Sequence, residues 1–249
     1  NDSGQCGAVV TYSGSGSDNC GIASETFNPA SGSFFNVGTT TVSYTVTDSS
    51  GNSDSCTFTV TVNDTEAPVA ICPAPITVGN DSGQCGAVVT FTGSGTDNCG
   101  IASDSFNPAS GSFFAVGTTN VTYTVTDSAG NSDSCMFDVT VNDTEAPIAV
   151  CPGPISLSND SSICGAAVTF TVSATDNCGI LSAIPSVNSG DFFGVGTTIV
   201  TYIAIDSSNN IDTCQFSVTV TDNEPPVAIC PANITVSNDT GQCGANVNF

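Results

Sequence analysis

The chain has 249 residues, with no lysine, arginine or histidine against 23 acidic residues, and so carries a formal net charge of −23. Such a surface repels phosphate groups, which excludes nucleic acid and anionic membrane surfaces as partners. Without histidine or lysine, a serine or cysteine nucleophile lacks its usual base, so the composition argues against an enzyme. Apolar runs stay well short of the roughly 20 residues of a membrane helix, so we expect no direct membrane insertion in this segment.

A repeat with a period of 79 residues organises the whole chain. The segment that begins at Asn1 returns, with some changes in the later copies, at Asn80, Asn159 and Asn238. A period of this length predicts one compact domain per repeat. The boundary lies where a strand-like run stops at proline, in a segment with an Asp-x-Glu pair. We expect a partial domain over 1–63, complete domains over 64–142 and 143–221, and the start of a further domain over 222–249.

Alternation of apolar and polar residues predicts strands throughout the repeat. In the first copy, apolar side chains alternate with threonine and serine over 41–47 and again over 57–62, and the turn-rich segment 48–54 joins them as a hairpin. In the second copy we expect a strand over 87–91, and an edge strand over 76–78 because prolines precede it. Several short strands without helical periodicity predict an all-β chain of tandem immunoglobulin-like β-sandwiches.

Each repeat also holds a pair of adjacent phenylalanines, Phe113-Phe114 in the second copy. Adjacent residues of a strand point to opposite faces, so we expect one ring in the core and the other over an edge or a joint between domains. The alternative is an exposed aromatic patch that binds a ligand.

The cysteines indicate disulfides and an oxidising, extracellular location. There are four cysteine columns per repeat, with no Cys-x-x-Cys pair and no histidine, so a zinc site is disfavoured. A domain of this size has a small core, which disulfides would stabilise. The columns are Cys6, Cys85, Cys164, Cys243; Cys20, Cys99, Cys178; Cys56, Cys135, Cys214; and Cys72, Cys151, Cys230.

Four segments of the second copy together resemble the hyalin repeat (HYR) family: PVAICP at 68–73, TDNCG at 96–100, VGTTNVTYTVTD at 116–127 and CMFDVTV at 135–141. The resemblance covers the whole chain. It implies an immunoglobulin-like extracellular module used in adhesion. The four-cysteine version without basic residues is similar to repeats in very large cell-surface adhesins of gliding Bacteroidetes.

The resemblance also implies a disulfide between the first and last strands of each domain, as Cys72–Cys135 and Cys151–Cys214. The remaining columns would then give Cys6–Cys20, Cys85–Cys99 and Cys164–Cys178, and would leave Cys56, Cys230 and Cys243 without a partner inside the chain. The strand over 87–91 carries the chain some 17 Å away from Cys85 at about 3.3 Å per residue, and residues 92–98 must bring it back. A domain-spanning pair such as Cys72–Cys99 therefore stays open.

The linkers hold acidic pairs that predict a cation site at each joint. In a sandwich the linker lies near loops at the entry pole of the following domain, so carboxylates from three segments converge there. Ca²⁺ takes six to eight oxygen ligands and is bound weakly by extracellular modules. The alternative is that these acids only form turns and keep the chain soluble. The candidate Ca²⁺ ligands are Asp64, Glu66, Asp97, Asn98, Asp127, Asp143, Glu145, Asp176, Asn177 and Asp206.

We therefore expect a structural repeat of an extracellular filamentous surface adhesin, a stiff stalk that mediates or presents adhesion, with gliding motility as one setting. Near-identical units favour a spacer over a unique site. The expected partners are adjacent repeats of the same chain, with surfaces or glycans beyond them. One alternative is a glycan- or surface-binding module, against which the absence of tryptophan counts. Another is a spacer within a secreted hydrolase.

Overall fold

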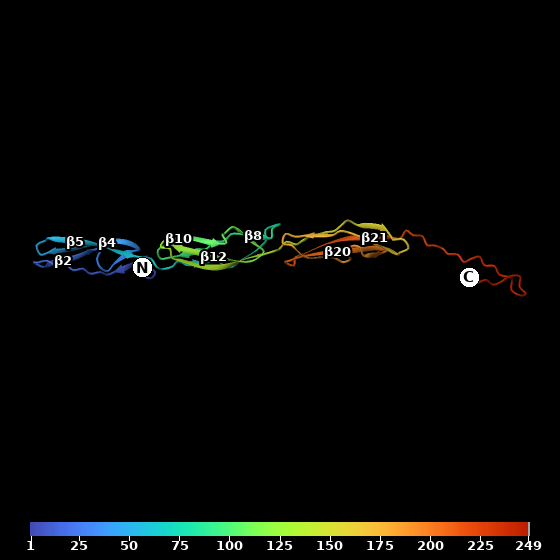
Figure 1. Ribbon diagram of the computed structural model, residues 1–249, viewed down its shortest axis with the longest axis horizontal. Helices are drawn as coiled ribbons and strands as arrows, with labels where there is room; N and C mark the ends of the chain where they lie inside the picture. Colours follow the sequence, from blue (N-terminus) through green and yellow to red (C-terminus); the bar gives the residue numbers. More distant parts are fainter. Residues whose placement is uncertain (249) are drawn as a thin grey trace. The chain divides into compact units, whose positions relative to one another are not determined.

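The computed structural model describes residues 1–248, and Figure 1 shows strands and connecting loops. Within these residues there is no helix, as the sequence predicts. The chain divides into two compact units, the first over residues 1–145 and the second from Ala146 onward. Phe249, the last residue of the expected domain 222–249, lies outside the described residues.

The second repeat, in the first unit, has a four-stranded sheet in the order β10-β12-β13-β7 and two short pairs, β8 with β11 and β6 with β9. The neighbours within the sheet are antiparallel except β7, which runs parallel to β13 at the edge. The edge position of β7 confirms the prediction. The strands are β6 (Val69–Ile71), β7 (Ile76–Gly79), β8 (Gly86–Val89), β9 (Ser94–Thr96), β10 (Ile101–Asn107), β11 (Ser112–Ala115), β12 (Gly117–Asp127) and β13 (Ser132–Asn142).

The core of the second repeat lies between the main sheet and the short β8–β11 pair. Alternate residues of β12 and β13 face it, among them Val121 and Val139, both completely buried. Their β-branched side chains fit a pleated surface, which is why these segments form strands. Phe91 packs edge-on against Phe114 and Phe137, with ring centroids 6.0 and 5.1 Å away.

The two adjacent phenylalanines point to opposite faces of β11, as predicted. Phe114 is 2% exposed in the core, while Phe113 is 52% exposed on the outer face. The Phe113 ring lies over Gly86 of β8, where a Cβ would collide with this ring and with the carbonyl oxygen of Phe114. Gly86 is therefore required by the close approach of the Phe113 ring, which covers the start of β8.

The first repeat has a three-stranded sheet, β2-β4-β5, and the pair β1-β3, while the third repeat again has four strands, β15-β21-β20-β18. The strands of the first are β1 (Gly7–Val10), β2 (Ile22–Asn28), β3 (Ser33–Asn36), β4 (Gly38–Asp48) and β5 (Ser53–Val62). Those of the third are β14 (Ile148–Val150), β15 (Ile155–Ser158), β16 (Gly165–Ala167), β17 (Ser173–Thr175), β18 (Ile180–Pro185), β19 (Phe192–Gly194), β20 (Gly196–Asp206) and β21 (Ile211–Thr221). Residues 222–248 contain no strand.

Candidate functional site at the joint between consecutive repeats

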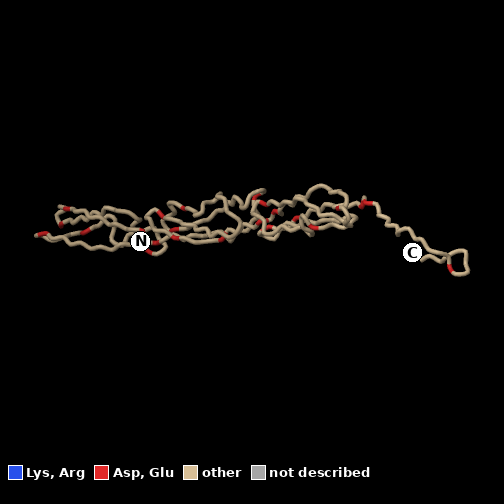
Figure 2. The backbone as a smooth tube through the Cα atoms, turned by 45° about the vertical axis from the view of Figure 1, so that its right-hand side comes forward, with Lys and Arg blue, Asp and Glu red and all other residues tan. Residues whose placement is uncertain are grey.

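The first unit contains one complete joint, where the linker after β5 leads into the second repeat. In the Cα trace of Figure 2, acidic positions are red along the chain and no position is blue, because basic side chains are absent. The carboxylates near this joint must therefore be satisfied by hydrogen-bond donors or by cations from solution. The joint is built from the linker, the 1–6 loop of the first repeat and two loops of the second.

The linker residue Glu66 holds the loop of the first repeat that begins at Asn1. Its carboxylate accepts hydrogen bonds from the Ser3 hydroxyl at 3.1 Å and from the Gly4 backbone N–H at 2.8 and 3.0 Å. Gly4 has a φ of 72°, in the left-handed region that favours glycine, and this conformation turns its N–H toward the linker. The side-chain amide of Asn1 also donates to Asp64 Oδ1, at 2.9 Å. We call these hydrogen bonds between the linker acids and the 1–6 loop the linker clamp, or the clamp.

The same clamp recurs in the later copies. Glu145 accepts from the Ser82 hydroxyl and the Gly83 N–H, at 3.0 and 2.8 Å. Glu224 accepts from the Ser161 hydroxyl and the Ser162 N–H, at 3.0 and 2.7 Å. The Asn-Asp-Ser/Thr segment and the Asp-x-Glu linker therefore recur together because they contact each other. In each case the linker glutamate accepts hydrogen bonds from the loop of the repeat before it.

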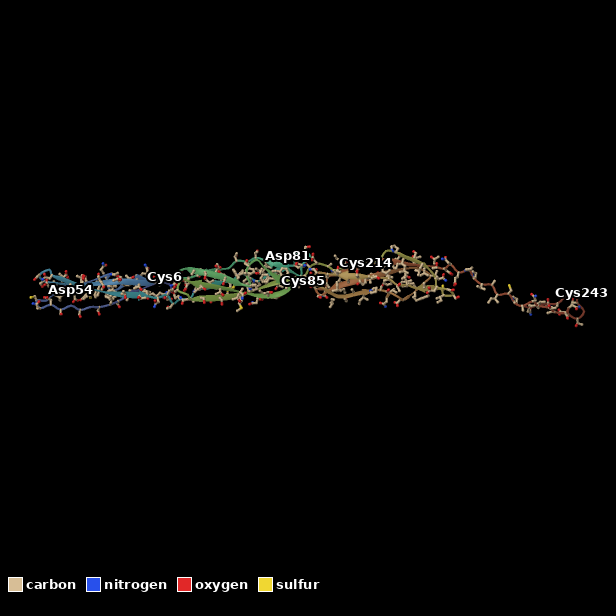
Figure 3. All side chains as sticks on the ribbon, turned by 45° about the horizontal axis from the view of Figure 1, so that its top comes forward. Cys6, Asp54, Asp81, Cys85, Cys214 and Cys243 are labelled. Carbon is tan, nitrogen blue, oxygen red and sulfur yellow. A yellow bond between two sulfur atoms is a disulfide. The ribbon has the colours of Figure 1, made fainter. Side chains whose placement is uncertain are left out.

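A disulfide joins the two repeats directly. Cys6, labelled in Figure 3, is bonded to Cys99 across 93 residues of sequence, with the Cα atoms 4.7 Å apart. Beside it, the side-chain amide of Asn98 donates to the Gln5 carbonyl at 2.8 Å. Consecutive repeats in the first unit are therefore linked by a covalent bond as well as by the chain itself.

This bond corrects the expected pairings Cys6–Cys20 and Cys85–Cys99. The carbonyl of Cys85 accepts a hydrogen bond from Val116 N, which places Cys85 beside the start of β12. Cys99 lies near Ile101, and Ile101 pairs with Asp127 at the other end of β12. Eleven residues at about 3.3 Å each put some 33 Å between these ends, far beyond disulfide reach. Cys20 is a free, exposed cysteine.

The other predicted short pair, Cys164–Cys178, is also wrong, because Cys164 is free while Cys178, like Cys85, is disulfide-bonded. The two long pairs that the resemblance implied are present. Cys72–Cys135 and Cys151–Cys214 each span 63 residues, with Cα atoms 5.9 Å apart in both. The open alternative Cys72–Cys99 is thereby excluded. The free cysteines are Cys20, Cys56, Cys164, Cys230 and Cys243.

Asp127, one of the expected cation ligands, is used by its own hairpin loop. Its Oδ1 accepts from the N–H groups of Ala129 and Asn131, and its Oδ2 accepts from the Asn131 side-chain amide, all at 2.8 Å. Burial raises the pKa of Asp127, but the hydrogen bonds from Asn131 and from the loop backbone outweigh it, so the pKa lies below its ordinary value of 3.8. Asp206, at the equivalent position of the third repeat, has the same bonds to Ser208 and Asn210.

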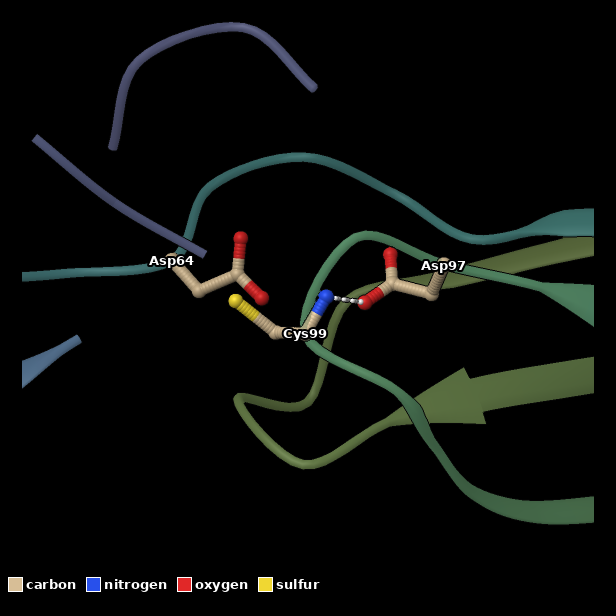
Figure 4. Close-up of side chains that lie close together, drawn as sticks. All are labelled: Asp64, Asp97 and Cys99. Carbon is tan, nitrogen blue, oxygen red and sulfur yellow. Dashed lines mark hydrogen bonds between the residues drawn. The ribbon is translucent and has the colours of Figure 1, made fainter. Parts of the chain in front are cut away.

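Two acidic side chains of the expected set do converge. One carboxylate oxygen each of Asp64 and Asp97 and the Cys99 sulfur all lie within 4.8 Å of one another. Figure 4 shows the two carboxylates pointing toward each other, with Asp97 anchored by the Cys99 N–H, which donates to its Oδ2 at 2.7 Å. Asp64 is only 7% exposed. The buried atoms Asp64 Oδ2, Asp97 Oδ1 and Asn98 Oδ1 have no hydrogen-bond partner.

The structure thus separates the candidate ligands of the first joint into two groups. Asp64, Asp97 and Asn98 each have a buried oxygen without a hydrogen-bond partner, whereas the carboxylates of Glu66 and Asp127 accept hydrogen bonds from the loops around them. Among the later candidates, Glu145 accepts from Gly83 N in the clamp, and Asp206 accepts from Ser208 N in its own loop. Asp176 accepts from Cys178 N at 2.7 Å. Asp143 Oδ1 accepts from Glu145 N at 3.3 Å, and Asn177 donates to Cys178 Sγ at 3.6 Å.

Sequence reasoning missed the clamp and the bond between repeats. The signal for the clamp was present, since the Asn-Asp-Ser/Thr loop and the Asp-x-Glu linker recur together. The signal for the disulfide was weaker. The 79-residue period identifies cysteine columns, but it does not tell whether a bond closes within one copy or between two.

Comparison with known proteins agrees with the repeat structure. The sequence model of the HYR domain matches residues 2–62, 63–141 and 142–220. Hyalin of Strongylocentrotus purpuratus is 37% identical over 234 residues, covering 88% of this chain but 20% of that protein. A serine-rich adhesin for platelets from Staphylococcus aureus (strain MSSA476) is 29% identical over 174 residues, covering 59% of this chain and 8% of the adhesin. The chain spans about a fifth of the length of that hyalin.

Among solved structures, Drosophila N-cadherin EC1-4 aligns with 77% of this chain and 60% of its own, at 15% identity and a TM-score of 0.34. At that level no detail transfers from one protein to the other. Among the described residues, no helix is long and apolar enough to cross a membrane. The family assignment rests on the three domain matches, which together cover residues 2–220. The chain belongs to the HYR domain family.

Proposed function

We propose that this chain is a stalk segment of an extracellular adhesive protein at the cell surface, in which joints between repeats are stiffened to hold an adhesive end away from the cell. The observation that carries the proposal is the Cys6–Cys99 bond between consecutive repeats. A linker alone would let domains reorient, as weakly packed neighbours generally do. A second covalent connection at the joint, beside the Glu66 clamp, restricts that motion.

Several properties support an extracellular, adhesion-related role. Disulfides persist in oxidising compartments, and this chain has them both within a repeat and between repeats. The chain is similar in sequence to proteins named hyalin and serine-rich adhesin for platelets. Basic and histidine side chains that would activate a nucleophile are absent, which supports a structural role over catalysis. The direct partners of each repeat are the adjacent repeats of the same chain. The net negative charge of −23 makes neighbouring stalks repel one another.

The proposal includes surface filaments of gliding bacteria, whose adhesins the four-cysteine repeats resemble. The test is made on cells that produce the native protein. Antibodies against the repeats are applied to intact cells and located by electron microscopy, and attachment to a surface is compared with a strain in which the gene is deleted. We expect label on thin projections and fewer attached cells after deletion. Label confined to a secreted particle that carries a hydrolase, with attachment unchanged, would replace the stalk by the spacer alternative.

A further inference from the structure

We propose that Asp64, Asp97 and Asn98 form a binding site for Ca²⁺ at the joint between the first and second repeats. Two independent features point to it. The carboxylates of Asp64, in the linker, and Asp97, in the loop after β9, have oxygens within 4.8 Å of each other beside the Cys6–Cys99 bond. One oxygen on each of the three side chains is buried and has no donor.

The unpartnered oxygens are the stronger of these features. Buried polar atoms in folded proteins almost always have a partner, because an unsatisfied one costs about 1–3 kcal/mol and a charged one more. Asp64 is more than nine-tenths buried, and its Oδ2 has no hydrogen-bond partner. The nearby donors are already committed, since Asn1 donates to Asp64 Oδ1 and Cys99 N donates to Asp97 Oδ2.

The charge of the site selects a cation. Two carboxylates this close repel each other, and the chain has no lysine, arginine or histidine to place between them. The compensating charge must therefore come from solution.

The donor atoms select the kind of cation. Carboxylate and side-chain amide oxygens are hard ligands that suit Ca²⁺, and the Cys99 sulfur is in a disulfide, so it offers no thiolate for zinc or copper. Three protein oxygens leave room for water in a shell of six to eight ligands. Two of the three proposed ligands, Asp97 and Asn98, line an open hollow together with Gly4, Glu66 and Thr96, which gives the ion and its waters access from that side. With so few protein ligands we expect weak binding, about 10⁻⁴–10⁻³ M as in other extracellular modules.

The first repeat supplies a matched control. Asp18 occupies the position of Asp97 one period earlier and forms the same turn, accepting from Cys20 N at 2.7 Å. It belongs to no cluster of potential metal ligands among the described residues. Asp18→Asn therefore removes the same charge from the same local turn without touching the proposed site, which separates site binding from general attraction of Ca²⁺ to an acidic chain.

The experiment uses the full oxidised chain with its free thiols alkylated, and the Cys6–Cys99 peptide is checked in every variant. CaCl₂ is titrated while the backbone amides of residues 97–99 and the side-chain amide of Asn98 are followed by NMR, with MgCl₂ and NaCl as separate arms. Melting temperature is measured in EGTA and in saturating Ca²⁺. Asp97→Asn keeps an oxygen acceptor for Cys99 N, so it should fold.

We expect Ca²⁺ to shift these signals in a saturable way and to raise the melting temperature of the wild-type chain and of Asp18→Asn. In Asp97→Asn the signals stay in place at the same Ca²⁺ concentrations, and melting in EGTA occurs at or above the wild-type temperature because the repulsion with Asp64 is gone. Equal responses of Asp97→Asn and wild type, or responses reproduced by NaCl, would overturn the proposal. The stalk role does not depend on the outcome, because the disulfide and the clamp need no ion.

Discussion

Replacing Phe114 with alanine is expected to lower the free energy of unfolding of the second repeat by about 3–5 kcal/mol, whereas the same change at Phe113 should cost less than about 1 kcal/mol. Phe114 is 2% exposed and packs in the core with Phe91, so its removal leaves a cavity among groups that cannot fully collapse. Phe113 is 52% exposed on the opposite face, and its loss mainly uncovers Gly86. The two substitutions are matched in chemistry and differ only in the face of β11.

Because the chain has several repeats, a single melting curve does not report on the second repeat alone. Hydrogen exchange of the β12 and β13 amides measures the opening free energy of that repeat directly. The expected result is faster exchange throughout both strands in Phe114→Ala and near wild-type rates in Phe113→Ala. Similar rates in the two variants would show that the core does not lie where the burial of these rings places it.

Replacing both Cys72 and Cys135 with serine is expected to destabilise the second repeat by about 4 kcal/mol, while Cys56→Ser leaves the first repeat unchanged. The disulfide closes a loop of 63 residues, and the chain-entropy model gives a loss of about that size when the loop is opened. Cys56 lies at the position of Cys135 one period earlier, opposite Tyr44 as Cys135 is opposite Tyr123, but it is free and exposed.

Denaturant unfolding combined with exchange of β13 amides measures this difference. Cys56→Ser makes the same change from sulfur to a hydroxyl without opening a disulfide, so the comparison isolates the covalent bond. If Cys56→Ser destabilised the first repeat as much as the double variant destabilises the second, the effect would come from the side chain and not from the cross-link, and the entropic argument would fail.

The regular parts of the fold follow from local patterns. The alternation over 41–47 and 57–62 predicts β4 and β5, because each side of these strands meets a uniform environment. The prolines before Ile76 predict that β7 lies at an edge, but its parallel pairing with β13 depends on the path of the whole domain and has no local signal. The split between Phe113 and Phe114 was also predictable, since adjacent residues in a strand point to opposite faces.

The joint was predictable only in part. The acids that recur in the linker predicted that carboxylates converge at the joint, and Asp64 and Asp97 do lie close together there. The sequence could not separate these acids from Glu66 and Asp127, because the groups that satisfy Glu66 come from the preceding repeat and those that satisfy Asp127 come from its own loop. The predicted pair Cys6–Cys20 was wrong for a related reason. The sequence does not tell that the columns of Cys6 and Cys20 lie at opposite ends of the long central strand in each repeat, as Cys85 and Cys99 do beside β12.

The disulfide and the linker contacts hold the first and second repeats together at their joint, and ¹⁵N relaxation of the full oxidised chain tests this most directly. Amides of β4 and β5 report on the first repeat, and those of β12 and β13 on the second. We predict that both sets fit one common rotational diffusion tensor, and that Cys6→Ser with Cys99→Ser introduces independent motion between them. Separate tensors for the two repeats in the oxidised wild-type chain would contradict the account.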